Sequence, residues 1–133
     1  MKKVSWAKLL EAAQSATQGE RIISPFMEGG YVSTALLTDK GNIYTGINLE
    51  SKCALSMCSE RFALYKVFEA NKNEKLIRCV CLHRGRVSLP CGACREFFMQ
   101  YGNDSEEMEI LLDIKTEKTV KLKDTMAPWW GKD

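Results

Sequence analysis

Two cysteine-bearing stretches constrain this chain more than any other feature. Pro90-Cys91-Gly92-Ala93-Cys94 follows Cys58-Ser59-Glu60-Arg61 by 33 residues, and each stretch stands where a helix is expected to begin. Cysteines three apart in a first helical turn share one face. The start of a helix offers unpaired backbone N–H groups and the positive end of the dipole, and both favour the thiolate that binds metals. A fold that brings the two stretches together would gather three thiolates.

The candidate metal ligands are Cys58, Cys91 and Cys94, and zinc is the ion that this chemistry indicates. Structural zinc sites take four protein ligands, whereas three ligands leave a position for water and mark a catalytic site. A carboxylate beside that water is a natural general base, and Glu60 is the candidate. Because residues two apart do not share a helix side, Cys58 and Glu60 converge only if the metal lies beyond the helix end. Three thiolates overcompensate a divalent ion, and Arg61 and the two helix N-termini would offset the excess charge.

Other interpretations of the cysteines stay open at this point. The pair at the second helix alone could be structural or redox-active. Cys53 could complete a closed four-cysteine zinc site in a binding module without catalysis. We assign Cys79 and Cys81 to packing, as small apolar side chains on opposite faces of one strand. His83 is the only histidine, and we leave it out of the site as a structural residue.

Length and charge limit the class of protein. The chain has 133 residues, which predicts one domain over residues 1–133, and its 45% apolar and 27% charged fractions are ordinary for a globular protein. A formal charge of +2 argues against a dedicated nucleic-acid binder, so the basic residues at 72–78 and 84–86 indicate a solvated face.

No segment of the sequence is typical of a membrane span or an export signal. No apolar run approaches the ~18 residues that cross a bilayer. Met1-Lys2-Lys3 is basic like the start of a signal peptide, but Glu11 and Gln14 interrupt the apolar stretch that should follow. We therefore expect a cytoplasmic protein, in which the six cysteines serve metal binding, catalysis or packing rather than disulfides.

The hydrophobic pattern predicts helices and strands in the order α-β-β-α-β-α-β-β. Helices are expected from Trp6 to just before Gly19, over 58–71 and over 91–101. The second of these has apolar residues on nearly all sides, which predicts a buried helix. Strands are expected at 31–38 and 43–48, joined as a hairpin, and at 76–83, 108–114 and 115–122. This order predicts an α/β fold, with a sheet covered by helices on its faces.

The paired motifs resemble those of the zinc-dependent cytidine deaminases, whose ligand-and-glutamate signature includes a three-cysteine variant. Ala35-Leu36-Leu37-Thr38, with Gly41 and Gly46, is similar to the opening hairpin of that family. Asn48-Leu49-Glu50 resembles the segment that holds the ribose in nucleoside deaminases. Pro128-Trp129-Trp130-Gly131 is similar to the terminal proline, aromatic residue and glycine of the family.

The resemblance implies a fold, an assembly and an activity. The fold would be a three-layer α-β-α arrangement around a mixed five-stranded sheet. The activity would be zinc-dependent hydrolytic deamination of cytidine or deoxycytidine to uridine or deoxyuridine with release of ammonia, as in pyrimidine salvage. A cysteine in the position before Ser59-Glu60 is similar to the small homotetrameric branch, in which neighbouring subunits complete each site. One zinc ion per chain and a small nucleoside substrate are expected.

Roles for individual residues follow from the same resemblance. Glu60 would take a proton from the water that attacks ring carbon 4, and would then deliver protons to ring nitrogen 3 and to the leaving amine. Asn48 and Glu50 would hydrogen-bond the ribose hydroxyl, and main-chain groups at Ser59 and Leu89 would hold the base. A site built around a hydroxyl rejects ligands without one, because its own polar groups would be left unpaired.

The chain departs from the family around the substrate rather than around the metal. The phenylalanine that stacks on the base is missing at its usual offset, and Phe26 or Tyr31 could replace it. Phe26, Trp129 and Trp130 are therefore the candidates for an aromatic lid. Blasticidin S deaminases share the scaffold and metal motifs and are the alternative within this chemistry. The Asn48–Glu50 segment and Arg61 favour a nucleoside substrate.

Overall fold

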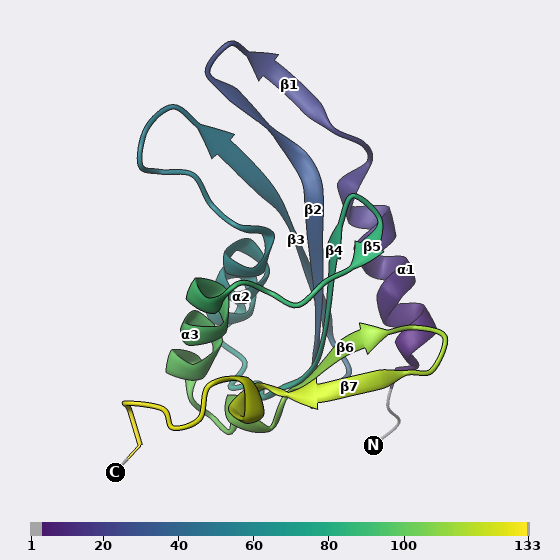
Figure 1. The fold of residues 1–133 in the computed structure, drawn as a ribbon, viewed down its shortest axis with the longest axis vertical. Coiled ribbons are helices and arrows are strands. Elements are labelled where there is room, and N and C mark those ends of the chain that lie inside the picture. The colour runs from purple at the N-terminus through teal and green to yellow at the C-terminus, as the bar shows by residue number, and fades with distance from the viewer. Residues whose placement is uncertain (1–3, 133) are drawn as a thin grey trace.

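The computed structural model describes residues 4–132, which form one mixed β-sheet with helices on both faces (Figure 1). Met1-Lys2-Lys3 lies outside the described residues. The elements in chain order are α1 (Trp6–Thr17), β1 (Arg21–Ser24), β2 (Met27–Thr38), β3 (Ile43–Ser51), α2 (Ser59–Ala70), β4 (Leu76–His83), β5 (Arg86–Val87), α3 (Gly92–Tyr101), η1 (Ser105–Glu107), β6 (Glu109–Asp113), β7 (Lys118–Lys121) and η2 (Leu122–Thr125). Within this part of the chain, no helix is long and apolar enough to span a bilayer.

The long strand β2 is the centre of the sheet. Its antiparallel partner on one side is β3, and on the other side its first residues pair with β1 and its later residues with β4. β4 runs parallel to β6, and β7 closes that edge antiparallel to β6. The expected mixed sheet is confirmed, but it has seven strands rather than five. The two additional strands, β1 and β5, have four and two residues, which is too short for an alternating pattern to stand out.

Alternate residues of β2 divide the core into two layers. Leu36 faces α2 and α3, where it packs with Leu64 and Phe98. Its neighbours Ala35 and Leu37 point to the opposite face, which α1 covers. Figure 1 shows α1 on one side of the sheet and α2 and α3 on the other, which confirms the three-layer expectation. The helices α2 and α3 therefore begin on the same side of the sheet.

The exposed side of α2 corrects one prediction. A wholly buried helix was expected, but only one face of α2 packs on the sheet, and Phe68 on the other face is 70% exposed. Tyr65 and Phe97 are exposed beside it, around a groove of about 370 Å³ between α2 and α3. The apolar residues of α2 thus lie on two faces. One face packs on the sheet, and the other has no packing partner within residues 4–132.

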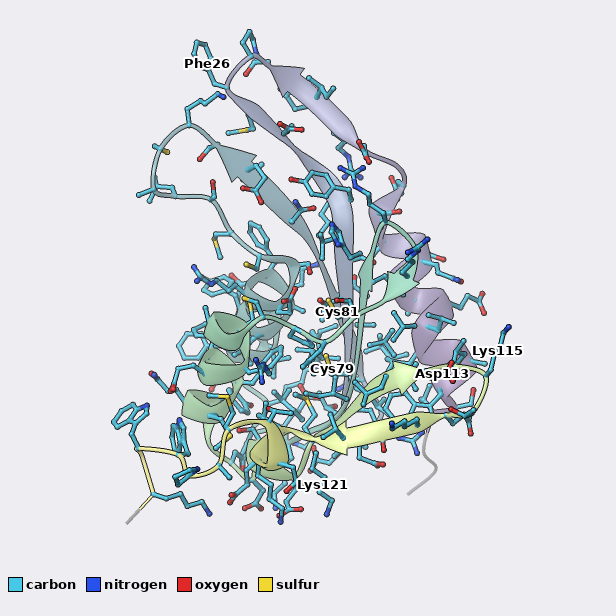
Figure 2. The ribbon with its side chains drawn as sticks, viewed as in Figure 1. Phe26, Cys79, Cys81, Asp113, Lys115 and Lys121 are labelled. Atoms are coloured by element: carbon cyan, nitrogen blue, oxygen red, sulfur yellow. The ribbon has the colours of Figure 1, made fainter. Side chains whose placement is uncertain are left out.

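The two cysteines of β4 correct a second prediction. Cys79 and Cys81 are both buried, as expected, but they lie on the same side of the strand, because side chains two residues apart on a strand share a face. Cys79 packs in the core beneath α2 and α3, and Cys81 lines the pocket described below. Figure 2 labels both residues near the middle of the molecule.

Candidate active site

Two helix starts gather three thiols. Cys58 is the N-cap residue of α2, Cys91 is the N-cap residue of α3, and Cys94 lies in the first turn of α3. Neither capping cysteine uses its side chain to cap its helix. The three sulfur atoms lie within 4.8 Å of one another. The predicted convergence of the two motifs is therefore confirmed.

The sulfur group fits a single zinc ion. Tetrahedral ligands at a Zn–S distance of about 2.3 Å would stand about 3.8 Å apart, and the three sulfur atoms lie within 4.8 Å of one another. Backbone N–H groups of Cys94 and Ala93 lower the pKa of the Cys91 thiol. Burial raises the pKa of the Cys58 and Cys94 thiols, so a cation is needed to hold those two sulfurs as thiolates.

Cys53 does not join this group. Its sulfur lies 3.3 Å from the hydroxyl of Ser51 on the exposed loop after β3, and the three-sulfur cluster found among residues 4–132 does not include it. The closed four-cysteine alternative is therefore not favoured. A position for a fourth, non-protein ligand is what distinguishes catalytic from structural zinc.

The carboxylate of Glu60 lies beside the sulfurs. Glu60 is in the first turn of α2 and is only 4% exposed. Its Oε1 atom accepts hydrogen bonds from the hydroxyls of Ser59 at 2.5 Å and Thr34 at 3.2 Å. After burial, the charge of Glu60 is the strongest influence raising the pKa of the Cys94 thiol, which places the carboxylate next to the cluster. Cys58 and Glu60 therefore converge beyond the end of α2, as predicted.

A pocket of about 220 Å³ opens over these groups. Its wall contains the four residues predicted to bind substrate, together with the carboxylate and two of the three predicted metal ligands: Asn48, Glu50, Ser59, Leu89, Glu60, Cys58 and Cys91. The structure thus brings these residues together around one cavity. Their individual roles stay predictions.

Asn48 is held in an unusual way by the backbone of β2. Its side-chain Oδ1 accepts hydrogen bonds from the N–H groups of Gly30, Tyr31 and Val32, at 3.0, 3.0 and 2.9 Å. The three donors lie where the pairing between β2 and β3 shifts register. The Nδ2 atom of Asn48 is buried and has no hydrogen-bond partner. A residue of the pocket wall therefore has a buried donor whose hydrogen-bonding capacity is unused, which is costly unless an acceptor reaches it.

None of the three predicted lid residues lines this pocket within one chain. Phe26 is exposed at the β1–β2 turn, at the far end of the molecule from the C-terminus (Figure 2). Trp129 and Trp130 lie against α3, where the indole N–H of each donates to the carboxylate of Glu96. Trp129 also packs on the core. The lid role of these three residues stays a prediction. It requires that they reach the pocket of a neighbouring subunit.

Two aromatic rings that do line the pocket are those of Tyr31 and His83. Their ring centroids are 6.4 Å apart, and the guanidinium of Arg84 lies 4.6 Å from the Tyr31 ring centroid. His83 was expected to be a structural residue outside the site, and the structure places its ring in the pocket wall. Its position at the end of a strand that leads toward the cysteine motif was the signal that could have included it.

Arg61 and the other basic residues are accounted for by their neighbours. The charge of Arg61 lowers the pKa of the Cys58 thiol, in the direction expected of a charge-offsetting residue. Lys75 pairs with Asp104 at 2.8 Å, and Arg84 pairs with Glu20. These pairings support the prediction that the basic stretches form a solvated face.

The fold and the pocket together define a hydrolytic enzyme with a cysteine cluster able to hold a metal ion beside a buried carboxylate. No family model matches the chain. A Dictyostelium discoideum protein named probable cytidine deaminase is 38% identical over 115 residues, which cover 84% of this chain and 75% of that protein. A Mycobacterium tuberculosis cytidine deaminase is 30% identical over 115 residues, covering 85% and 80% of the two chains.

Solved structures agree with these relatives. The crystal structure of cytidine deaminase from Mycobacterium tuberculosis superposes with a TM-score of 0.78 at 26% identity, covering 97% of this chain and 99% of that chain. The cytidine deaminase structure from Burkholderia pseudomallei gives a TM-score of 0.73 at 25% identity, covering 94% and 98%. This chain belongs to the cytidine deaminase family.

Proposed function

We propose that this chain catalyses the hydrolytic deamination of cytidine and deoxycytidine to uridine and deoxyuridine, with release of ammonia, as a step of pyrimidine salvage. The observation that carries the proposal is the buried carboxylate of Glu60 beside the three-sulfur cluster, in one pocket with Asn48 and Glu50. Membership of the cytidine deaminase family supports the same reaction. Blasticidin S deamination and a purely structural zinc site are not favoured.

In this proposal Cys58, Cys91 and Cys94 hold one zinc ion per chain. Bound zinc supplies Lewis acidity, which makes water a nucleophile near neutral pH. Two helix N-termini and Arg61 offset the charge of the three thiolates, which would otherwise weaken that acidity. The cluster therefore has both the donor atoms and the compensating charge that a catalytic zinc site needs.

Glu60 moves the protons of the reaction. It accepts a proton from the attacking water as the bond to ring carbon 4 forms, and it protonates ring nitrogen 3. It then takes the second water proton and passes it to the exocyclic amine, which leaves as ammonia when its bond to carbon 4 breaks. The water oxygen becomes the carbonyl oxygen of the uracil ring. Burial of the carboxylate in the pocket wall brings it within reach of these atoms.

Asn48 and Glu50 bind the sugar. The Nδ2 group of Asn48 is a donor without a partner, and the carboxylate of Glu50 is an acceptor on the same wall. A hydroxyl group donates one hydrogen bond and accepts others, so a ribose hydroxyl can satisfy both side chains at once. Main-chain groups of Ser59 and Leu89, which also line the pocket, hold the base.

The assembly we propose is a homotetramer of chains in the cytoplasm, each with one catalytic domain over residues 1–133. The exposed aromatic residues Tyr65, Phe68 and Phe97 on the outer side of α2 and α3 support association, because apolar patches of this kind are uncommon on monomers. Neighbouring subunits would also supply the aromatic lid that one chain does not place over its own pocket.

The test measures ultraviolet absorbance loss and ammonia release from purified wild-type protein with cytidine, deoxycytidine and blasticidin S, and zinc content on the same samples. Nucleoside turnover with about one zinc per chain is expected. Glu60→Gln should keep zinc and fold but lose about 10²–10⁴-fold in kcat, the range of general acid–base catalysis. The exposed residue Glu69 lies on the same helix, and Glu69→Gln should change nothing.

Each result that differs from these expectations identifies which part of the proposed function is wrong. Turnover of blasticidin S alone would keep the reaction and replace the substrate. An active Glu60→Gln enzyme would refute the role of Glu60. Zinc without turnover of any of the three compounds would refute the proposed activity.

A further inference from the structure

Two hydroxyls from outside the cysteine cluster hold the carboxylate of Glu60. Thr34 Oγ1 donates to Glu60 Oε1 at 3.2 Å, and Ser59 Oγ donates to the same oxygen at 2.5 Å. The two hydroxyl oxygens are themselves 2.9 Å apart. Thr34 and Ser59 are both fully buried. The three side chains thus form a closed cluster. We call Thr34 and Ser59 the hydroxyl pair of Glu60.

The members of the hydroxyl pair come from different elements. Ser59 is the first residue of α2, and Thr34 lies in the middle of β2. Thr34 is fixed in the sheet by its pairing with Gly46 of β3 and Cys81 of β4. A β-branched side chain on a central strand has little freedom about its first torsion angle. The sheet therefore provides a rigid hydrogen-bond donor to Glu60 from outside α2, the helix that carries Glu60.

Both hydroxyls act on one carboxylate oxygen. Thr34 and Ser59 both point to Oε1, so neither hydroxyl occupies Oε2. Two donors on Oε1 use its acceptor capacity and fix the rotation of the carboxylate. Oε2 is then the oxygen that remains free to accept and deliver protons.

We propose that Thr34 and Ser59 are positioning residues for the reaction: they hold Oε1 of Glu60 so that Oε2 faces the attacking water and the ring. This inference rests on the proposed function, since it assigns a role only if Glu60 transfers protons. Thr34 does not line the pocket, and both Thr34 and Ser59 are fully buried. A carboxylate misplaced by a fraction of an ångström loses rate rather than substrate affinity, because proton transfer is more sensitive to geometry than binding is.

The test uses Thr34→Val, which removes the hydroxyl and keeps the size and branching of the side chain. We expect kcat to fall about tenfold, with KM within twofold of wild type and zinc content unchanged. Thr34→Ser restores a hydroxyl in the same place and should recover most of kcat. Ser59→Ala should have an effect similar to that of Thr34→Val, and the double variant should lose less than the product of the two single losses, because both donors serve one oxygen.

The neighbouring residue Ser33 provides a matched control. It is buried on the same strand, points to the opposite face, and its hydroxyl has no hydrogen-bond partner. Ser33→Ala should therefore leave kcat, KM, zinc content and the unfolding temperature near wild type.

Several results would overturn the inference while leaving the proposed function intact. These are an unchanged kcat in both Thr34→Val and Ser59→Ala, no recovery in Thr34→Ser, an equal loss in Ser33→Ala, or loss of zinc with loss of activity. If Thr34→Val does not fold, Ser59→Ala alone decides between a tenfold loss and none. A wild-type enzyme without deaminase activity would instead refute the proposed function on which the inference rests.

Discussion

Glu74 is a buried carboxylate that does not line the pocket, and it ties the β2–β3 hairpin to the loop before β4. Its Oε1 atom accepts hydrogen bonds from Thr38 Oγ1 at 2.8 Å and Asn42 Nδ2 at 2.5 Å, and its Oε2 atom accepts from the Tyr44 hydroxyl at 2.6 Å. Three donors on one charged group leave it fully satisfied although it is only 1% exposed.

Glu74→Gln keeps the size of the side chain but removes the charge and turns one oxygen into a donor. Hydrogen bonds to a charged group contribute about 1.5–3 kcal/mol each and neutral ones about 1 kcal/mol, so weakening three of them should lower the free energy of unfolding by about 3 kcal/mol. That corresponds to a fall in Tm of about 10 °C for a chain of this size. The bonds from Tyr101 and Asn103 go to the backbone carbonyl of Glu74 and are not removed.

The dependence on pH separates this explanation from simple loss of packing. Burial raises the pKa of the Glu74 carboxyl, but hydrogen bonds from Tyr44, Asn42 and Thr38 outweigh burial, so the pKa lies below its ordinary value. A lowered pKa in the folded state stabilises the fold above the pKa of the unfolded chain, and this contribution is lost as pH falls through the folded-state pKa. The difference in Tm between wild type and variant should therefore be widest near neutral pH and shrink in acid.

The assay is thermal unfolding followed by circular dichroism at a series of pH values, with Glu69→Gln as an exposed control that should shift Tm by no more than about 2 °C. Because loss of zinc in acid affects both chains, only the difference between them is interpreted. A Tm unchanged by Glu74→Gln at neutral pH, or a difference that does not vary with pH, would refute the reasoning.

Three further predictions concern the cysteine cluster and the C-terminal tryptophans. Cys53→Ser should leave zinc content and Tm unchanged, because its sulfur lies outside the cluster, and zinc loss in metal analysis would restore a fourth-ligand role. Arg61→Ala should lower kcat with zinc retained, since its charge favours the Cys58 thiolate, and unchanged kinetics would contradict that role. Trp129→Ala should lower the free energy of unfolding by about 2 kcal/mol because the ring packs on the core, whereas Trp130, 75% exposed, should tolerate alanine within about 0.5 kcal/mol. A kcat/KM unchanged by Trp130→Ala would remove that ring from the lid.

Long elements with strong sequence signals were predictable from the sequence. The strand at 76–83 was predicted with its observed bounds, and the helix that begins after Ser5 does so because the Ser5 side chain accepts a hydrogen bond from the backbone of Lys8. Cys58, Cys91 and Cys94 were predictable because each stands at a helix start, a position that local sequence specifies well.

Features that depend on contacts between distant segments were not predictable from the pattern. Thr34 reads as one more β-branched strand residue, and only the placement of α2 over β2 makes its hydroxyl a partner of Glu60. His83 and Tyr31 share a wall of the pocket because the sheet brings residues 52 positions apart together. The exposed side of α2 was mistaken for a buried one because Tyr65 and Phe68 are apolar although they are exposed, and sequence pattern alone does not tell the two cases apart.

Two contacts made by β2 shape the site, and both depend on the same register of β2 in the sheet. Its backbone at residues 30–32 holds the amide of Asn48, and its Thr34 side chain holds the carboxylate of Glu60. Gly29 allows the close approach that the first contact needs, because a β-carbon there would overlap the carbonyl oxygen of Asn48. A slip of one residue would turn Thr34 toward α1 and withdraw the N–H groups from Asn48 together. The register shift between β2 and β3 is therefore what aligns the amide of Asn48 and the carboxylate of Glu60 on one pocket wall.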